Sequence, residues 1–116
     1  MKPIVIYSDR FLKAISWLFI VDGISLFPFV FLRERFKDTE YGKQMLNHET
    51  IHFQQAVETL FIGFYLIYLL NFAFNLVKYG DSKIAYYSIL FEHEAYDNEA
   101  DLEYLSKRKR YCWISL

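Results

Sequence analysis

The stretch from Leu60 to Val77 contains no charged side chain, and it constrains the fold more than any other part of the chain. Only Gly63, Asn71 and Asn75 interrupt it with small or polar residues. A run of this length approaches the roughly 20 residues that a helix needs to cross a bilayer. The stretch is therefore either a marginal membrane span or a helix that something else must cover.

Composition limits the size and the partners of the fold. With 116 residues, the chain is expected to form one domain, 1–116, with a modest core. Its formal net charge of −1 gives no reason to expect nucleic acid as a partner. Lys13 and Pro28 interrupt the apolar N-terminal region and spoil the pattern of a signal peptide, so we expect a cytoplasmic protein, with membrane association as the alternative. The single cysteine, Cys112, rules out an internal disulfide.

Two of the three histidines lie four residues apart in the pentad His48-Glu49-Thr50-Ile51-His52. On a helix, residues with this spacing share a face and lie roughly 6 Å apart, so both imidazoles can bind one metal ion. Glu49 is too close in sequence to the first histidine to be a ligand beside it, and it is well placed to accept a proton from a bound water. The pentad predicts two metal ligands and a base. The alternative is a helix with two ordinary histidines and a salt-bridging glutamate.

A catalytic zinc site usually has three protein ligands, so a third has to come from elsewhere. The acidic segment 91–101 lies on a helical pattern that we expect to run from about Ser82 to Lys107. Glu94 lies beside the core stripe of this pattern, whereas Glu92 falls nearer the exposed side. We therefore predict Glu94 as the third ligand and keep Glu92 in reserve, with His93 exposed or otherwise satisfied. The alternative is a solvated acidic face. The core stripe reads Phe91, Ala95, Asn98, Leu102 and Leu105.

An HExxH pentad followed by a helix that carries glutamate resembles the zincin metallopeptidases of the gluzincin type. The resemblance implies zinc held by two histidines and a glutamate, with Glu49 as the base. In that clan an Asp four residues after the third ligand commonly bonds a ligand histidine; Asn98 holds this place relative to Glu94, and Tyr96 holds it relative to Glu92. The strings HExxHxxQ and FExEAYxNE also resemble a set of short, uncharacterised bacterial proteins described as metallopeptidases.

The N-terminal apolar region is expected to divide into a helix over about Ser8 to Val21 and a strand over about Ile24 to Arg33. Pro28 cannot donate to a strand ladder, so this strand should lie at an edge. The zincin resemblance implies that such an edge holds an extended peptide beside the metal helix. The alternative is that residues 25–31 simply cover the helices as core.

Ligand geometry decides how the uncharged stretch must fold. If Leu60 to Val77 were a straight span, His52 and Glu94 would lie about 27 Å apart, too far for one metal ion. We therefore predict a break or sharp bend between about Thr59 and Leu66, with Gly63 as a candidate. The excess apolar surface of 60–77 would then be covered by a homodimer interface or by a membrane surface.

Together these patterns predict a mainly α (α+β) fold, with a zincin-like helical core and a short edge strand or small sheet near the N-terminus. They favour a zinc-dependent metallopeptidase that acts on a peptide or protein substrate, with Zn²⁺ bound by His48, His52 and Glu94 and with Glu49 as the catalytic base. One alternative is a non-catalytic zinc-binding structural or interaction protein, in which Glu49 has no essential role. Another is a small membrane-associated helical protein without metal.

Overall fold

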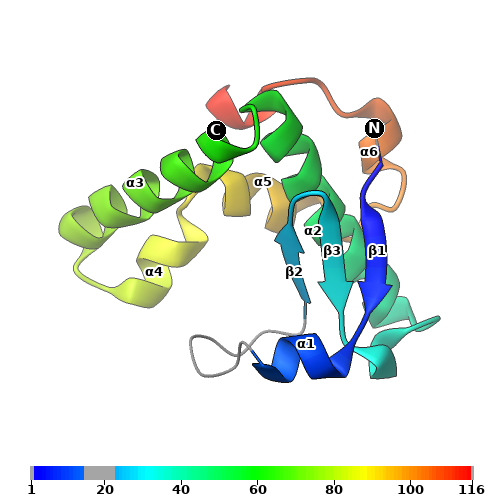
Figure 1. Cartoon of the computed structure of the whole chain (residues 1–116). Coiled ribbons are helices and arrows are strands. Elements are labelled where there is room, and N and C mark those ends of the chain that lie inside the picture. Colours follow the sequence, from blue (N-terminus) through cyan, green and yellow to red (C-terminus); the bar gives the residue numbers. More distant parts are fainter. Residues whose placement is uncertain (1, 15–22, 116) are drawn as a thin grey trace.

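The computed structural model describes residues 2–14 and 23–115, and helices make up 65% of it. Figure 1 shows a small sheet lying against one long helix, with the first short helix at one end of the sheet. The expected mainly α fold with a small N-terminal sheet is confirmed. In chain order the elements are β1 (Ile4–Tyr7), α1 (Asp9–Ala14), β2 (Gly23–Leu26), β3 (Phe29–Leu32), a 3-10 turn (Glu34–Phe36), α2 (Glu40–Glu58), α3 (Ile62–Tyr79), α4 (Ser82–Tyr87), α5 (Leu90–Asn98), α6 (Tyr104–Lys107) and a second 3-10 turn (Cys112–Ser115).

The sheet has the strand order β1-β3-β2, with β1 parallel and β2 antiparallel to β3. The prediction of one strand from Ile24 to Arg33 is wrong, because the chain reverses at Phe27-Pro28 and forms the hairpin of β2 and β3. Pro28 has no N–H to donate and lies in the turn, where its carbonyl accepts a hydrogen bond from the Ile4 amide at 3.0 Å. The edge strand next to α2 is therefore β2. The predicted N-terminal helix covers Asp9–Ala14 as α1, and its remainder, 15–21, lies outside the described residues.

The long helix α2 begins with a capped first turn. The Thr39 hydroxyl accepts a hydrogen bond from the Gly42 amide at 2.9 Å and so caps the first turn. Gly42 is needed because a Cβ there would lie 1.9 Å from the Phe36 carbonyl oxygen. The buried face of α2 carries both pentad histidines together with Ile51 and Gln55, so this helix is the base on which the candidate site is built.

The predicted break after the pentad is confirmed, since α2 ends at Glu58 and α3 begins at Ile62. The turn itself is made by Leu60 and Phe61, both in the left-handed region with φ of 57° and 66°. Gly63 lies inside the first turn of α3 instead. A left-handed residue with a side chain costs about 1 kcal/mol or more. The Phe61 ring offsets part of this cost by stacking on Phe27, with 3.8 Å between the ring centroids.

The prediction of one continuous helix from Ser82 to Lys107 is wrong, because α4, α5 and α6 are separate. The helix is first interrupted between Tyr87 and Leu90. There the Asn71 side-chain oxygen of α3 accepts a hydrogen bond from the Leu90 amide at 2.8 Å and anchors the start of α5. Phe91 and Ile89 then enter the main core, which lies between α2, α3 and α5. This folding back brings α5 against α2. The buried members of that core are Ala56, Phe64, Ile89, Phe91 and Trp113.

Candidate metal centre

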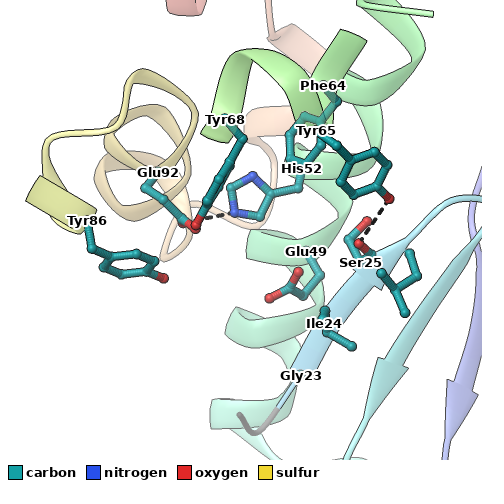
Figure 2. A pocket seen from close by; sticks show the side chains of 11 residues that line it. Gly23, Ile24, Ser25, Glu49, His52, Phe64, Tyr65, Tyr68, Tyr86 and Glu92 are labelled. Carbon is teal, nitrogen blue, oxygen red and sulfur yellow. Dashed lines mark hydrogen bonds and ion pairs between the residues drawn. The ribbon is translucent and has the colours of Figure 1, made fainter. Parts of the chain in front are cut away.

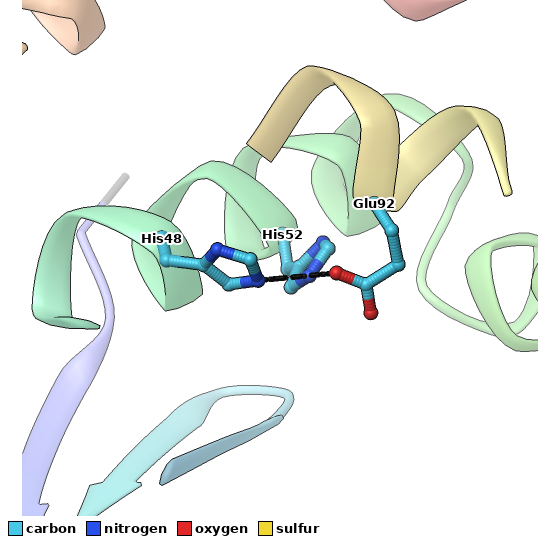
Figure 3. A group of neighbouring side chains, drawn as sticks. All are labelled: His48, His52 and Glu92. Carbon is cyan, nitrogen blue, oxygen red and sulfur yellow. Dashed lines mark hydrogen bonds and ion pairs between the residues drawn. The ribbon is translucent and has the colours of Figure 1, made fainter. Parts of the chain in front are cut away.

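Three buried side chains from α2 and α5 meet at one point. His48 Nε2 and His52 Nε2 are 3.1 Å apart, and the same Glu92 oxygen, Oε1, lies 3.1 Å from the first and 2.9 Å from the second. Figure 3 shows the two imidazole rings and the carboxylate directed at one another. Within residues 2–14 and 23–115, this is the one group of three metal-ligand side chains whose ligand atoms all lie within 4.8 Å of one another.

The structure brings Glu92, not Glu94, to the histidines. Glu92 is only 4% exposed, although its position on the helical pattern predicted the exposed side. Glu94 is 1% exposed but turns toward Arg108, whose Nη2 donates to its Oε1 at 3.0 Å and whose Nε donates to its Oε2. The prediction of Glu94 as the third ligand therefore does not fit this geometry, and the reserve residue takes its place. His93 is half exposed and pairs with Asp97 at 2.9 Å, as expected for a satisfied side chain.

Glu94 belongs to a buried ion-pair network. The Arg108 guanidinium also binds Glu58 with two hydrogen bonds, of 2.6 and 3.0 Å, and Tyr104 donates to Glu94 at 2.7 Å. Burial raises the pKa of Glu94, but the hydrogen bonds from Arg108, Gln55 and Tyr104 outweigh burial and lower it to about 2. Glu94 is therefore a charged partner of arginine.

Each histidine has a hydrogen-bond partner on its outer nitrogen. His48 Nδ1 lies 2.7 Å from Glu99 Oε2, and His52 Nδ1 lies 2.8 Å from Gln55 Oε1. Asn98, which the gluzincin pattern would place against a histidine, instead donates to the Glu94 backbone carbonyl at 2.8 Å. Such outer contacts orient ligand histidines and raise their basicity. Here the Glu99 carboxylate contacts His48, and the Gln55 side-chain amide contacts His52.

The contacts of Gln55 decide which nitrogen of His52 faces the centre. The Gln55 amide nitrogen donates to the Phe91 carbonyl at 3.1 Å and to Glu94 at 3.0 Å, so its oxygen must face His52. An amide oxygen only accepts, and His52 Nδ1 must therefore carry the proton. In the neutral ring this leaves a lone pair on Nε2, the atom that points at His48 and Glu92.

The donor set fits zinc. Ligand atoms held in a tetrahedron at zinc-to-nitrogen and zinc-to-oxygen distances of about 2.0–2.1 Å lie about 3.3 Å from one another. The three separations here, 2.9 to 3.1 Å, are close to that value. Two imidazoles and one carboxylate are also the ligand set typical of catalytic zinc with an open fourth position.

Electrostatics of the cluster favour a positive charge between its members. Burial raises the pKa of Glu92, but the charge of His52 and the hydrogen bonds from both histidines bring it well below its usual range. Burial lowers the pKa of His52, but the charge and hydrogen bond of Glu92, the charge of Glu49 and the hydrogen bond to Gln55 together raise it to about 9. A proton or a metal ion meets this demand.

Glu49 lies on the wall of a cavity of about 480 Å³ that also reaches His52 and Glu92. Figure 2 shows its carboxylate between the ligands and the edge strand β2. Burial raises the pKa of Glu49 above its usual value, although both histidines lower it. The cavity is mostly apolar, and α3 and α4 supply its far wall. The other lining residues are Gly23, Ile24, Ser25, Leu26, Phe64, Tyr65, Tyr68 and Tyr86.

Two contributors escaped the sequence reasoning. The Tyr68 hydroxyl donates to Glu92 Oε2 at 2.6 Å and fixes the second oxygen of that carboxylate. No pattern distinguished it among ten tyrosines. Glu99, which contacts His48, was not predicted as a partner of the histidines, although it lies in the acidic segment 91–101.

Comparison with protein-family models, curated proteins and solved structures found no match to this chain.

Replacing Gln55 with methionine should weaken zinc binding about 10- to 100-fold, because His52 loses the acceptor that fixes its protonated nitrogen. Competition with a chromophoric chelator would measure the affinity. Gln54→Met is the matched control, since Gln54 lies one residue away and lines a separate cavity with Lys2 and Leu105. Equal affinities for the two variants would contradict the role of Gln55.

Proposed function

We propose that this protein is a zinc-dependent hydrolase of the metallopeptidase type. The observation that carries the proposal is the meeting of three ligand side chains, His48, His52 and Glu92, with a separate carboxylate, Glu49, on one cavity wall. A purely structural zinc site is usually closed by four protein ligands, whereas this group has three and opens toward a cavity. The resemblance to gluzincins supports the hydrolase through the pentad and a glutamate on a downstream helix, although with Glu92 as that glutamate Tyr96 holds the place of the clan's Asp, which fits the clan less well than Asn98 after Glu94.

The chemistry divides between the metal and the chain. A bound zinc ion supplies Lewis acidity, which lowers the pKa of a water toward about 7 and polarises a carbonyl. Glu49 takes a proton from the attacking water and returns it to the leaving nitrogen as the C–N bond breaks. A carboxylate whose pKa burial has raised suits both transfers. It is a stronger base toward the water, and its protonated form is still acidic enough to give the proton to the leaving nitrogen. Gln55 and Glu99 hold the histidine rings in place throughout.

The edge strand supports a peptide as the substrate. β2 pairs with β3 on one side only, and four of its residues line the cavity next to Glu49. An extended peptide can add to such an edge through main-chain hydrogen bonds. Its side chains would meet the apolar wall formed by Phe64 and Tyr65, so peptides with apolar residues next to the cleaved bond are the expected substrates.

One observation favours a second function, a zinc site that only fastens α2 to α5. Both histidines and Glu92 are buried, with at most 7% of each residue exposed, and they join two helices distant in sequence. In that case zinc would contribute folding free energy, and Glu49 would be dispensable.

Glu49→Gln separates the two functions. If the protein is a hydrolase, the variant should retain stoichiometric zinc and lose about 10²- to 10⁴-fold in turnover of a fluorogenic peptide library, because the proton acceptor is gone. His48→Ala should lose both zinc and turnover. Zinc content would be measured by atomic emission on protein purified without chelator. Unchanged turnover in Glu49→Gln, or wild-type protein that never carries near-stoichiometric metal, would refute the proposal.

A further inference from the structure

The outer face of α3 is a broad apolar surface in the described structure. Only 11% of this helix is buried, and exposure reaches 63% at Leu69 and 89% at Val77. Figure 1 shows α3 and α4 extending together away from the sheet, so that the other side of α3 faces outward. We call this surface the α3 outer face. It is formed by Ile62, Leu66, Leu69, Leu70, Phe74 and Val77.

Three polar side chains of α3 bond within the protein. Asn71 accepts from the Leu90 amide, Asn75 donates to the Ala85 carbonyl at 3.1 Å, and Tyr68 donates to Glu92. The residues of the α3 outer face are all apolar, and the charged residue of the helix, Lys78, lies in its last turn. This division is the pattern of a helix between a polar and an apolar phase.

The surroundings of the α3 outer face distinguish lipid from a protein partner. Protein interfaces have a polar rim, and paired helices carry charged residues beside the apolar seam. No charged residue occurs between Glu58 and Lys78, so α3 itself supplies no such rim over most of its length of about 27 Å. Exposed Lys78 stands at the end of the helix with its ammonium over the Tyr79 ring, and exposed Lys83 follows in α4; lysine and tyrosine are residue types that contact lipid headgroups.

We propose that α3 lies in the plane of a bilayer surface that contains anionic lipid, with the α3 outer face among the acyl chains and the two lysines at the phosphates. A transmembrane orientation is excluded by Tyr68, which lies near the middle of α3 and bonds Glu92. Spanning would carry this buried carboxylate and the neighbouring Glu49 to the bilayer centre, where charged side chains are strongly unfavourable. In the plane of the surface, the metal cluster stays on the protein side.

Flotation of the full chain with lipid vesicles tests the proposal. The protein should float with phosphatidylcholine vesicles that contain phosphatidylserine. The double variant Leu69→Glu/Phe74→Glu should bind about a hundred-fold or more weakly, because two large apolar side chains no longer enter the lipid. Leu102→Glu is the matched control, since Leu102 is 53% exposed but lies outside α3. It should bind as the wild type does.

The lysines provide a second measurement. Lys78→Glu and Lys83→Glu should each weaken binding about five-fold or more on vesicles with phosphatidylserine, with little effect on phosphatidylcholine alone. Circular dichroism would show that all variants fold. Absence of flotation would overturn the proposal, and a concentration-dependent dimer that Leu69→Glu/Phe74→Glu disperses would assign the face to a second copy. Flotation that Leu69→Glu/Phe74→Glu does not weaken would overturn it as well.

Discussion

Replacing Glu92 with alanine should lower the affinity for zinc on the order of a thousand-fold. The free energy of binding at a zinc site of four ligands is roughly 10–16 kcal/mol, so one ligand accounts for several kcal/mol. Glu92 Oε1 is also the one atom that contacts both imidazole nitrogens, at 3.1 and 2.9 Å. Its removal would leave a two-histidine site. Chelator competition and zinc content would measure the effect.

Glu94→Gln is the control variant for Glu92→Ala, because Glu94 is the other candidate for the third ligand. Glu94 acts on the cluster only through Gln55, so the variant should keep zinc affinity within about 10-fold while losing some stability through its weaker bond to Arg108. The opposite result, in which Glu94→Gln loses zinc and Glu92→Ala keeps it, would restore the ligand expected from the helical pattern. It would also show that α5 is rotated relative to the structure described here.

Arg108→Met should lower the free energy of unfolding by about 3–5 kcal/mol. The Arg108 side chain is 5% exposed and bridges Glu58 at the end of α2 to Glu94 on α5. Methionine would fill similar space but would leave two buried carboxylates close together without a counter-charge. The Trp113 indole would remain the only other described side chain that donates to Glu58. The loss is large because the penalty is that of uncompensated buried charge.

Thermal unfolding followed by circular dichroism would measure this effect, and a fall in melting temperature of roughly 10–20 °C is expected. Arg110→Met is the matched control, because Arg110 is exposed and its replacement should change stability by less than about 0.5 kcal/mol. If both variants melt like the wild type, Arg108 does not hold α2 and α5 together. A triple variant that also carries Glu58→Gln and Glu94→Gln should recover part of the lost stability.

The sequence narrowed the third ligand to Glu92 and Glu94, but it did not identify which of the two faces the histidines. The choice of Glu94 depended on the phase of one long helix, and residues Asn98 to Leu105 fixed that phase. In the structure the chain leaves the helix after Asn98, and Leu102 is exposed. On the short helix α5 both glutamates are buried, one toward the histidines and one toward Arg108. Burial alone therefore did not separate a ligand from an ion-pair partner.

The break after α2 shows the reverse case, in which a long-range requirement predicted a local structure. Metal geometry required a turn between Thr59 and Leu66, and the turn is there. Its residues could not be predicted, because glycine is the usual left-handed residue and Leu60 and Phe61 are not. Contacts with Phe27, far away in sequence, stabilise that conformation. The hairpin of β2 and β3 at Pro28 was missed for a similar reason. Its strand β3 also pairs with β1, which is distant in sequence and was not expected.

The two sides of helix α3 make different contacts. Tyr68 and Leu69 are neighbours in sequence, yet the first donates to Glu92, the proposed third ligand, and the second belongs to the α3 outer face. If that face docks as proposed, the candidate metal cluster is fixed one helix diameter, about 10 Å, from the lipid. If the protein is also the proposed hydrolase, confinement to a surface would supply selectivity by restricting hydrolysis to chains whose cleavable segment passes at that height above the membrane.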